Sequence, residues 1–419
     1  MENPIKIKEK KGFFQRIAEI AFMIYVVTLY IFVDRGESVI ISQISFIAFA
    51  GLTVIVILQR QRIHIGKGIL LVYLTFTWIF ATYFWAQNQY LAWVKIKTMW
   101  QLFLMFFLTY NLFCEQKNAY EFLLKTLYVA GISLIGYSIY IYGIGGMLDV
   151  LSTATTSHDR LGSEINQANT FGIFNAVTAL TAFYYFFYKK KYKILHVLII
   201  TLAFLYAMSS GSRKALLMIG IGVLFLTYKK YGTQKFYKVL LAGTVVAIVF
   251  VAVIQLPMFE FINQRMEQTV EVLTGDGKGD NSSKLRLNMI KDGWNIFKER
   301  LLTGYGADNY RLVTRYRTYA HNNLIEVLVN FGLTGFALYY LIYWNALKNL
   351  WKSENDVGKA LFCIFLVRFM MEIAAVTYYD KVHWILMAFF IMKPVEPTNN
   401  IGGEVENEII SEKTEEMCN

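Results

Sequence analysis

The sequence predicts an all-α, polytopic integral membrane protein with about twelve transmembrane helices and one long external loop. Of its 419 residues, 56% are hydrophobic and 17% are charged, which leaves too few polar side chains to cover a water-soluble globule of this size. Apolar runs close to 20 residues long recur along the chain, and a helix needs about that length to cross a bilayer. Lysine and arginine gather in alternate connections between these runs, which is the charge pattern of membrane proteins.

The same composition excludes several other classes of protein. The chain has only four prolines and 16% aromatic residues, which argues against a disordered or collagen-like chain. Cys114, Cys363 and Cys418 form no disulfide framework and no CxxC metal motif, so redox and zinc chemistry are not expected. The net charge is +11, and many of the basic residues lie in the connections between predicted spans. We therefore expect no nucleic acid partner.

Each apolar run between charged breaks is predicted to form one span, because a helix satisfies its own backbone hydrogen bonds in lipid. The predicted spans lie at about 17–33, 39–58, 69–86, 98–114, 122–142, 169–188, 194–208, 215–228, 239–256, 322–345, 360–376 and 383–392. Residues 1–256 are thus expected to hold nine spans, 257–321 an external loop subdomain, and 322–392 three further spans. Residues 393–419 are polar and acidic and are predicted to form a disordered tail.

The positions of the basic residues predict the orientation of the chain. If the basic N-terminal segment lies in the cytoplasm, successive crossings place the basic connections 60–67, 189–193, 229–238 and 348–359 on the same side, as the positive-inside rule requires. No A-x-A cleavage site follows the first run, so it is interpreted as an uncleaved span. Both termini are therefore expected to be cytoplasmic.

Two predicted external segments, 143–168 and 257–321, are longer than a turn. A loop as long as the second is usually functional or a small subdomain. Apolar residues recur in it at helical spacing, which predicts an amphipathic helix on the bundle or in the membrane interface. These residues are Leu287, Ile290, Trp294, Phe297 and Leu301. Arg286, Lys291 and Lys298 lie on the polar face, and Gly304-Tyr305-Gly306 is predicted to end the helix. The acidic and glycine-rich stretch 275–280 is interpreted as a flexible tip of this loop.

Three arginines stand at predicted external edges of the spans. Arg160 precedes the sixth span, Arg213 follows a Ser/Gly turn between the seventh and eighth, and Arg286 begins the loop helix. A guanidinium group matches phosphate oxygens bidentately and stays charged, so the three could hold a pyrophosphate-linked lipid. The residues alone leave other interpretations open: contact with lipid headgroups for Arg160, an ordinary tight turn for Arg213, and a water-facing position for Arg286.

A histidine opens the tenth span. His321 precedes Asn322 and Asn323, and Glu326 lies four residues after Asn322 on the same helical face. The positive end of the helix dipole disfavours imidazolium, so His321 is expected to stay neutral, the form that a general base requires. An interfacial polar residue would look the same in sequence.

Two pairs of residues within predicted spans have structural interpretations. Arg368 and Glu372, four residues apart, are expected to form an ion pair in the membrane, with a proton pathway as the alternative. Gly332 and Gly335 are expected to allow close approach of another helix.

Four segments carry a family resemblance in chain order: Arg160-Leu161-Gly162 to Asn169, the Gly211-Ser212-Arg213 turn, Arg286 to Gly306, and His321 to Gly335. Together they resemble the O-antigen ligase and Wzy-type polysaccharide polymerase family, multispan enzymes that act on undecaprenyl-pyrophosphate-linked glycans outside the cytoplasmic membrane. The chain departs from the family at Ala168 and Thr303, where members often carry proline, and its first five spans match only in hydropathy.

The resemblance implies a GT-C-like helical fold in the bacterial cytoplasmic (inner) membrane and a role for each matching residue. His321 is expected to be the catalytic base, and Arg213 and Arg286 are expected to bind the pyrophosphate. Arg160, Asn169, Asn322 and Glu326 are the other expected substrate-binding residues. No metal, nucleotide sugar or other cofactor is expected.

The function that the resemblance implies is polymerisation of lipid-linked oligosaccharide repeat units into O-antigen, capsule or exopolysaccharide. Expected partners are the lipid-linked donor and acceptor, membrane lipids, and a flippase and chain-length regulator of the same pathway. Transfer of a finished glycan to another acceptor is the alternative. A twelve-span transporter or flippase fits less well, because the halves show no repeat and the long loop is not at the midpoint.

Overall fold

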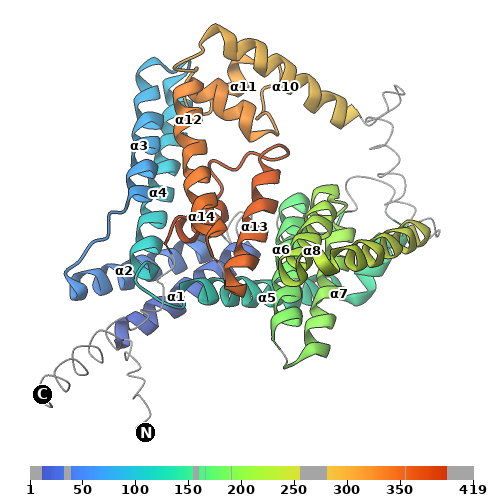
Figure 1. The fold of residues 1–419 in the computed structure, drawn as a ribbon. Helices are drawn as coiled ribbons and strands as arrows, with labels where there is room; N and C mark the ends of the chain where they lie inside the picture. The colour runs from blue at the N-terminus through green and yellow to red at the C-terminus, as the bar shows by residue number, and fades with distance from the viewer. Residues whose placement is uncertain are drawn as a thin grey trace, which may run out of the picture.

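The computed structural model describes residues 12–32, 39–153, 160–165, 167–189, 191–254, 281–353 and 355–393. Every regular element in these ranges is helical and none is a strand, which confirms the predicted all-α class (Figure 1). The helices are α1 (Phe13–Phe32), α2 (Val39–Arg60), α3 (Lys67–Ala81), η1 (Thr82–Trp85), α4 (Gln89–Phe113), α5 (Ala119–Thr153), α6 (Ala168–Tyr188), α7 (Lys193–Ser209), α8 (Arg213–Ile254), α10 (Asn281–Glu299), α11 (Tyr310–Val313), α12 (Asn323–Trp351), α13 (Asp356–Met371) and α14 (Lys381–Phe390).

Eight helical segments in the described part of the chain are long and apolar enough to cross a membrane. They belong to α1, α2, α3 with η1, α4, α5, α6, α8 and α12. The apolar helices α7 and α14 are shorter, with 17 and 10 residues. The chain is therefore a multi-pass membrane protein, while twelve crossings remain a prediction.

The connections between helices collect in two groups, and the predicted crossings place each group on one side of the membrane. In one group, Arg60 and His64 contact Glu115, and Lys189 pairs with Glu121 at 3.0 Å. In the other group, the backbone of Leu161 bonds to Ser209, Asn88 bonds to Asn309, and Asn323 bonds to Glu372. The contacts fit the predicted alternation of sides, and the assignment of one side to the cytoplasm remains a prediction.

Glycines interrupt three of the long helices. The backbone φ is +65° at Gly143 in α5, +66° at Gly232 in α8 and +67° at Gly332 in α12. The predicted connection 229–238 is therefore a kink within α8, because lysine, tyrosine and glutamine continue a helix and only the glycine turns it. At Gly332, an added Cβ would lie 2.3 Å from the Leu302 carbonyl carbon, so the 301–306 loop packs backbone to backbone on α12.

The predicted amphipathic helix is confirmed as α10, which lies across the N-terminal part of α12 (Figure 1). Its buried face differs from the predicted stripe. Met289, Gly293 and Phe297 are buried, whereas Leu287 and Trp294 are about half exposed. Gly293 explains the difference, because a Cβ there would lie 2.4 Å from Ile325, so the closest approach of the two helices is centred on the glycine.

Candidate active site

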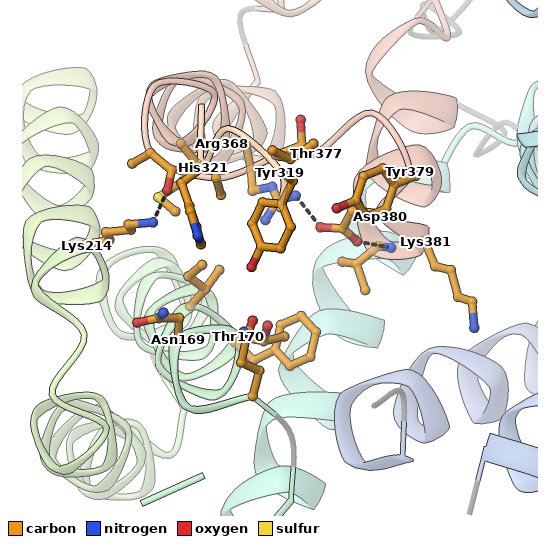
Figure 2. A pocket seen from close by; sticks show the side chains of 18 residues that line it. Asn169, Thr170, Lys214, Tyr319, His321, Arg368, Thr377, Tyr379, Asp380 and Lys381 are labelled. Atoms are coloured by element: carbon orange, nitrogen blue, oxygen red, sulfur yellow. Dashed lines mark hydrogen bonds and ion pairs between the residues drawn. The ribbon is translucent and has the colours of Figure 1, made fainter. Parts of the chain in front are cut away.

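A cavity of about 310 Å³ lies where four segments meet. Asn169 and Thr170 at the start of α6 line it, together with Lys214 at the start of α8 and Tyr319 and His321 before α12. The segment that joins α13 to α14, residues 371–382, forms the remaining wall. Figure 2 shows the side chains of His321, Tyr319, Asn169 and Thr170 around the central space, with Lys214 at its edge.

A fixed turn holds His321 at the cavity. Its φ is +55°, a left-handed conformation, and Asn322 follows it as the N-cap of α12. The Asn322 side chain accepts a hydrogen bond from the Ile325 N–H at 3.0 Å and donates one to the Ile373 carbonyl at 2.9 Å. The imidazole points into the cavity, with its centroid 4.2 Å from the Tyr319 ring (Figure 2). Among the described residues, no hydrogen bond engages either ring nitrogen, so a ligand can reach them.

Glu326 also stabilises the turn that holds His321. It is 1% exposed, and it accepts hydrogen bonds from the Ala320 N–H at 2.6 Å and from the Asn330 side chain at 3.3 Å. Glu326 and Asn322 thus fix the backbone on both sides of His321. The sequence predicts that these two residues contact substrate, and that role remains a prediction.

Glu372 holds the opposite wall. Its buried carboxylate accepts hydrogen bonds from the Asn323 amide at 2.5 Å, from the hydroxyls of Tyr340 at 3.0 Å and Tyr343 at 2.6 Å, and from the Thr377 hydroxyl. The expected ion pair between Glu372 and Arg368 is wrong for the described residues. Arg368 pairs instead with Asp380 at 2.9 Å. Glu372 is the C-cap of α13, and its carboxylate is occupied by these neutral donors. The guanidinium group of Arg368 therefore pairs with Asp380, the N-cap of α14.

Arg160 connects two of the cavity's segments. Its Nε donates to the Ser210 carbonyl at 2.6 Å and its Nη2 donates to Asn169 Oδ1 at 2.9 Å. Gly172 lets α6 approach this turn, because a Cβ there would lie 2.4 Å from Ser210 Oγ. The predicted substrate residues Arg160 and Asn169 are therefore in contact with each other and with the turn that precedes Arg213.

Among the described residues, Lys214, Arg368 and Lys381 line the cavity, and Arg368 is paired with Asp380. Lys214 donates to the Ala374 carbonyl, and the positive charges of Arg286, Arg160 and Arg213 lie close enough to act on the Lys214 ammonium. Burial, and after it the charges of Arg286 and Lys214, lower the pKa of His321 to about 4. His321 is therefore neutral at pH 7, as the helix dipole predicts. The structure brings the three predicted arginines and the histidine to one place.

Sequence reasoning missed Lys214 and the whole wall 371–382. Lys214 directly follows Arg213 in the same turn, and its place at the N-terminus of a span was the available signal. Residues 371–382 carry no motif, and hydrogen bonds of Asn322, Asn323 and Glu372 hold them against α12. In the ranges that the structure describes, no three histidine, cysteine, aspartate or glutamate side chains group as a metal site would need.

A comparison with protein families found a match over part of the chain. Residues 196–340 match the family model described as O-antigen ligase, a range that contains Arg213, Lys214, Arg286 and His321. A search of curated proteins found no match.

Proposed function

We propose, because residues 196–340 match the O-antigen ligase family model, that this chain polymerises undecaprenyl-pyrophosphate-linked oligosaccharide repeat units. The family indicates an enzyme of glycosyl transfer that acts on lipid-linked glycans in a membrane. The reaction would build a surface polysaccharide at the outer face of the cytoplasmic membrane.

One observation supports the proposal most strongly: a neutral imidazole faces a cavity that Lys214 lines, and the charges of Arg160, Arg213 and Arg286 lie close to Lys214. A phosphate site alone would need the cations and not the histidine. A general base alone would need no such accumulation of positive charge. Both are required when a hydroxyl must lose a proton while a diphosphate departs.

The donor diphosphate is assigned to Arg213, Lys214 and Arg286. The first two stand at the N-terminus of α8, where the helix dipole also favours anions. Arg160 supports this site through Ser210 and Asn169. The polyprenyl chain would extend from the cavity into the bilayer.

His321 acts on the acceptor. Its free ring nitrogen takes the proton of an acceptor sugar hydroxyl as that oxygen attacks the anomeric carbon of the donor. The bond from this carbon to the diphosphate breaks, and the diphosphate leaves with the electron pair, its charge stabilised by the cations. A diphosphate is a weak base and leaves without a general acid, so the pair of carboxylates used by glycosidases is not needed.

Chain extension by the purified protein tests the proposal. The protein in detergent receives the lipid-linked repeat unit without ATP or an ion gradient, and the products are separated by size. We expect longer lipid-linked glycans, and we expect His321→Ala to abolish extension while the variant still inserts and elutes as the wild type does. Movement of substrate across vesicles without chain growth would instead indicate a transporter.

Transfer of a finished glycan to another acceptor is a second candidate, favoured by the family description. The two reactions share the donor and differ in the acceptor. Deleting the gene separates them, because loss of a polymerase leaves single repeat units on the lipid, whereas loss of a ligase leaves long chains unattached.

A further inference from the structure

A second depression lies at the other end of α12 and α13. It has a volume of about 560 Å³, and α8, α12 and α13 line it. Met371 and Arg368 of α13 face the candidate active site, whereas Phe362 and Leu366, nearer the start of the same helix, face this groove. The proposed reaction does not use it. We call it the lysine groove.

The walls of the lysine groove follow helical spacing. Each helix presents residues three or four apart, so one face of each helix forms one wall. The lining residues are Phe225, Tyr228 and Lys229 of α8, Trp344, Leu347, Lys348, Trp351 and the following Lys352 of α12, and Phe362 and Leu366 of α13. Apart from the lysines, the walls are aromatic or aliphatic.

Charge and apolar surface are separated along the groove. Lys229, Lys348 and Lys352 all stand toward the C-terminal end of α12, while Phe225 and Leu366 lie deeper. The distance along α12 from Trp344 to Lys352 corresponds to about 12 Å at the helical rise. Of the described residues that line the groove, none is acidic. Among those described residues the three lysines meet no carboxylate, so the described lining of the groove is positive at this end.

Aromatic rings hold this end in the geometry of a membrane interface. The Lys229 ammonium lies 4.8 Å from the Trp351 ring and 4.9 Å from the Phe362 ring, and Lys348 lies 5.0 Å from the Trp344 ring. Trp344 and Trp351 are 53% and 66% exposed, far more than core tryptophans. Exposed tryptophans beside lysines at the end of a span mark the depth of lipid headgroups.

We propose that the lysine groove binds an anionic glycerophospholipid. The phosphate and headgroup would lie against the three lysines, and the acyl chains would run along the apolar walls toward Phe225 and Leu366. Basic pockets between transmembrane helices recognise anionic lipids by this combination of charge and apolar surface. A soluble anion would leave the apolar walls uncovered, and a zwitterionic lipid would leave the positive charge uncompensated.

The chain supplies a matched comparison. A second groove on the same side of the protein is lined by Lys125, Lys189 and Lys191, but it also contains Glu121, which pairs with Lys189 at 3.0 Å. Each groove therefore has three lysines, but only the comparison groove has a carboxylate in its described lining. If lipid recognition depends on positive charge without a carboxylate partner, the lysine groove should bind anionic lipid more tightly than the comparison groove.

Native mass spectrometry of the full chain tests the proposal. The purified protein in neutral detergent is titrated with phosphatidylglycerol or with phosphatidylcholine of the same acyl chains. We expect wild type to prefer phosphatidylglycerol, and we expect the triple variant Lys229→Gln, Lys348→Gln and Lys352→Gln to lose about tenfold or more in apparent affinity for it. The control variant Lys125→Gln, Lys189→Gln and Lys191→Gln should keep the preference.

Three outcomes would overturn the proposal. The first is an unchanged preference in the triple variant, and the second is an equal loss in both triple variants, which would indicate diffuse attraction of lipid to a basic surface. The third is a lipid-independent dimer that Trp351→Ala dissociates, which would make the groove a contact between two copies of the chain. All the substituted lysines are at least partly exposed, so folding is checked simply by elution and charge-state distribution.

Discussion

Replacing Arg286 and Lys214 by glutamine should raise the pKa of His321. Burial and these two cations together lower it from 6.5 to about 4. Burial is the largest of the three causes, so each single variant should raise the pKa of His321 by less than about one unit. The double variant should raise this pKa further without reaching 6.5, because burial remains.

The sign follows from the charge of the conjugate acid. Imidazolium is repelled by a neighbouring cation, so removing the cation stabilises the protonated form. Protonated His321 cannot accept a proton from the acceptor hydroxyl. The kcat/KM of wild type should thus stay level as the pH falls to about 5, and the acid limb should move upward in the variants.

The pKa can be measured without turnover. Diethyl pyrocarbonate acylates neutral imidazole, and mass spectrometry of the digested protein resolves the modification at His321 as a function of pH. Lys298→Gln removes an exposed positive charge from α10 and should leave the profile unchanged. A wild-type midpoint near 6.5, or a downward shift in the variants, would refute the electrostatic account of the site.

Three further changes test the diphosphate site and its support. Lys214→Gln should raise KM for the lipid-linked donor about tenfold in the extension assay, and Lys214→Arg should retain most of the affinity; equal KM values would remove Lys214 from the site. Glu372→Ala should lower the free energy of unfolding by about 3 kcal/mol, because the buried donors around Glu372 lose their acceptor. Glu372→Gln should lower it by less, and equal losses in the two variants would contradict the hydrogen-bonding role. Gly332→Ala should lower the free energy of unfolding by about 2–4 kcal/mol, because Gly332 has a positive φ and packs against the 301–306 loop. Gly136→Ala, where an added Cβ meets open space, should leave it unchanged in the same thermal unfolding experiment.

The fold class could be predicted from sequence because the length and spacing of apolar runs are imposed by the bilayer. The same reasoning placed the amphipathic helix at α10. It did not place the buried face of α10, since hydrophobicity favoured Leu287 and Trp294 while close packing favoured Gly293. Packing between helices depends on the partner surface, which no single helix contains.

Part of the site could be predicted from local sequence patterns. Arginine, histidine and Ser/Gly turns at the ends of predicted spans carry a chemical signal in the sequence. Residues 371–382 carry none, and they form a wall of the cavity through tertiary hydrogen bonds, among them those of Asn322, Asn323 and Glu372. The predicted partner of Arg368 was wrong, because proximity in sequence favoured Glu372. In the structure neutral donors surround Glu372, and Asp380 is the counterion of Arg368.

A cryo-electron microscopy map of the full chain with undecaprenyl pyrophosphate most directly tests the proposal that the cavity holds the donor diphosphate. We expect diphosphate density within hydrogen-bonding distance of Lys214 and Arg286, beside the His321 ring, with the prenyl chain leaving toward the bilayer. Density in the lysine groove alone, or a cavity that stays empty at saturating ligand, would contradict the proposed donor site.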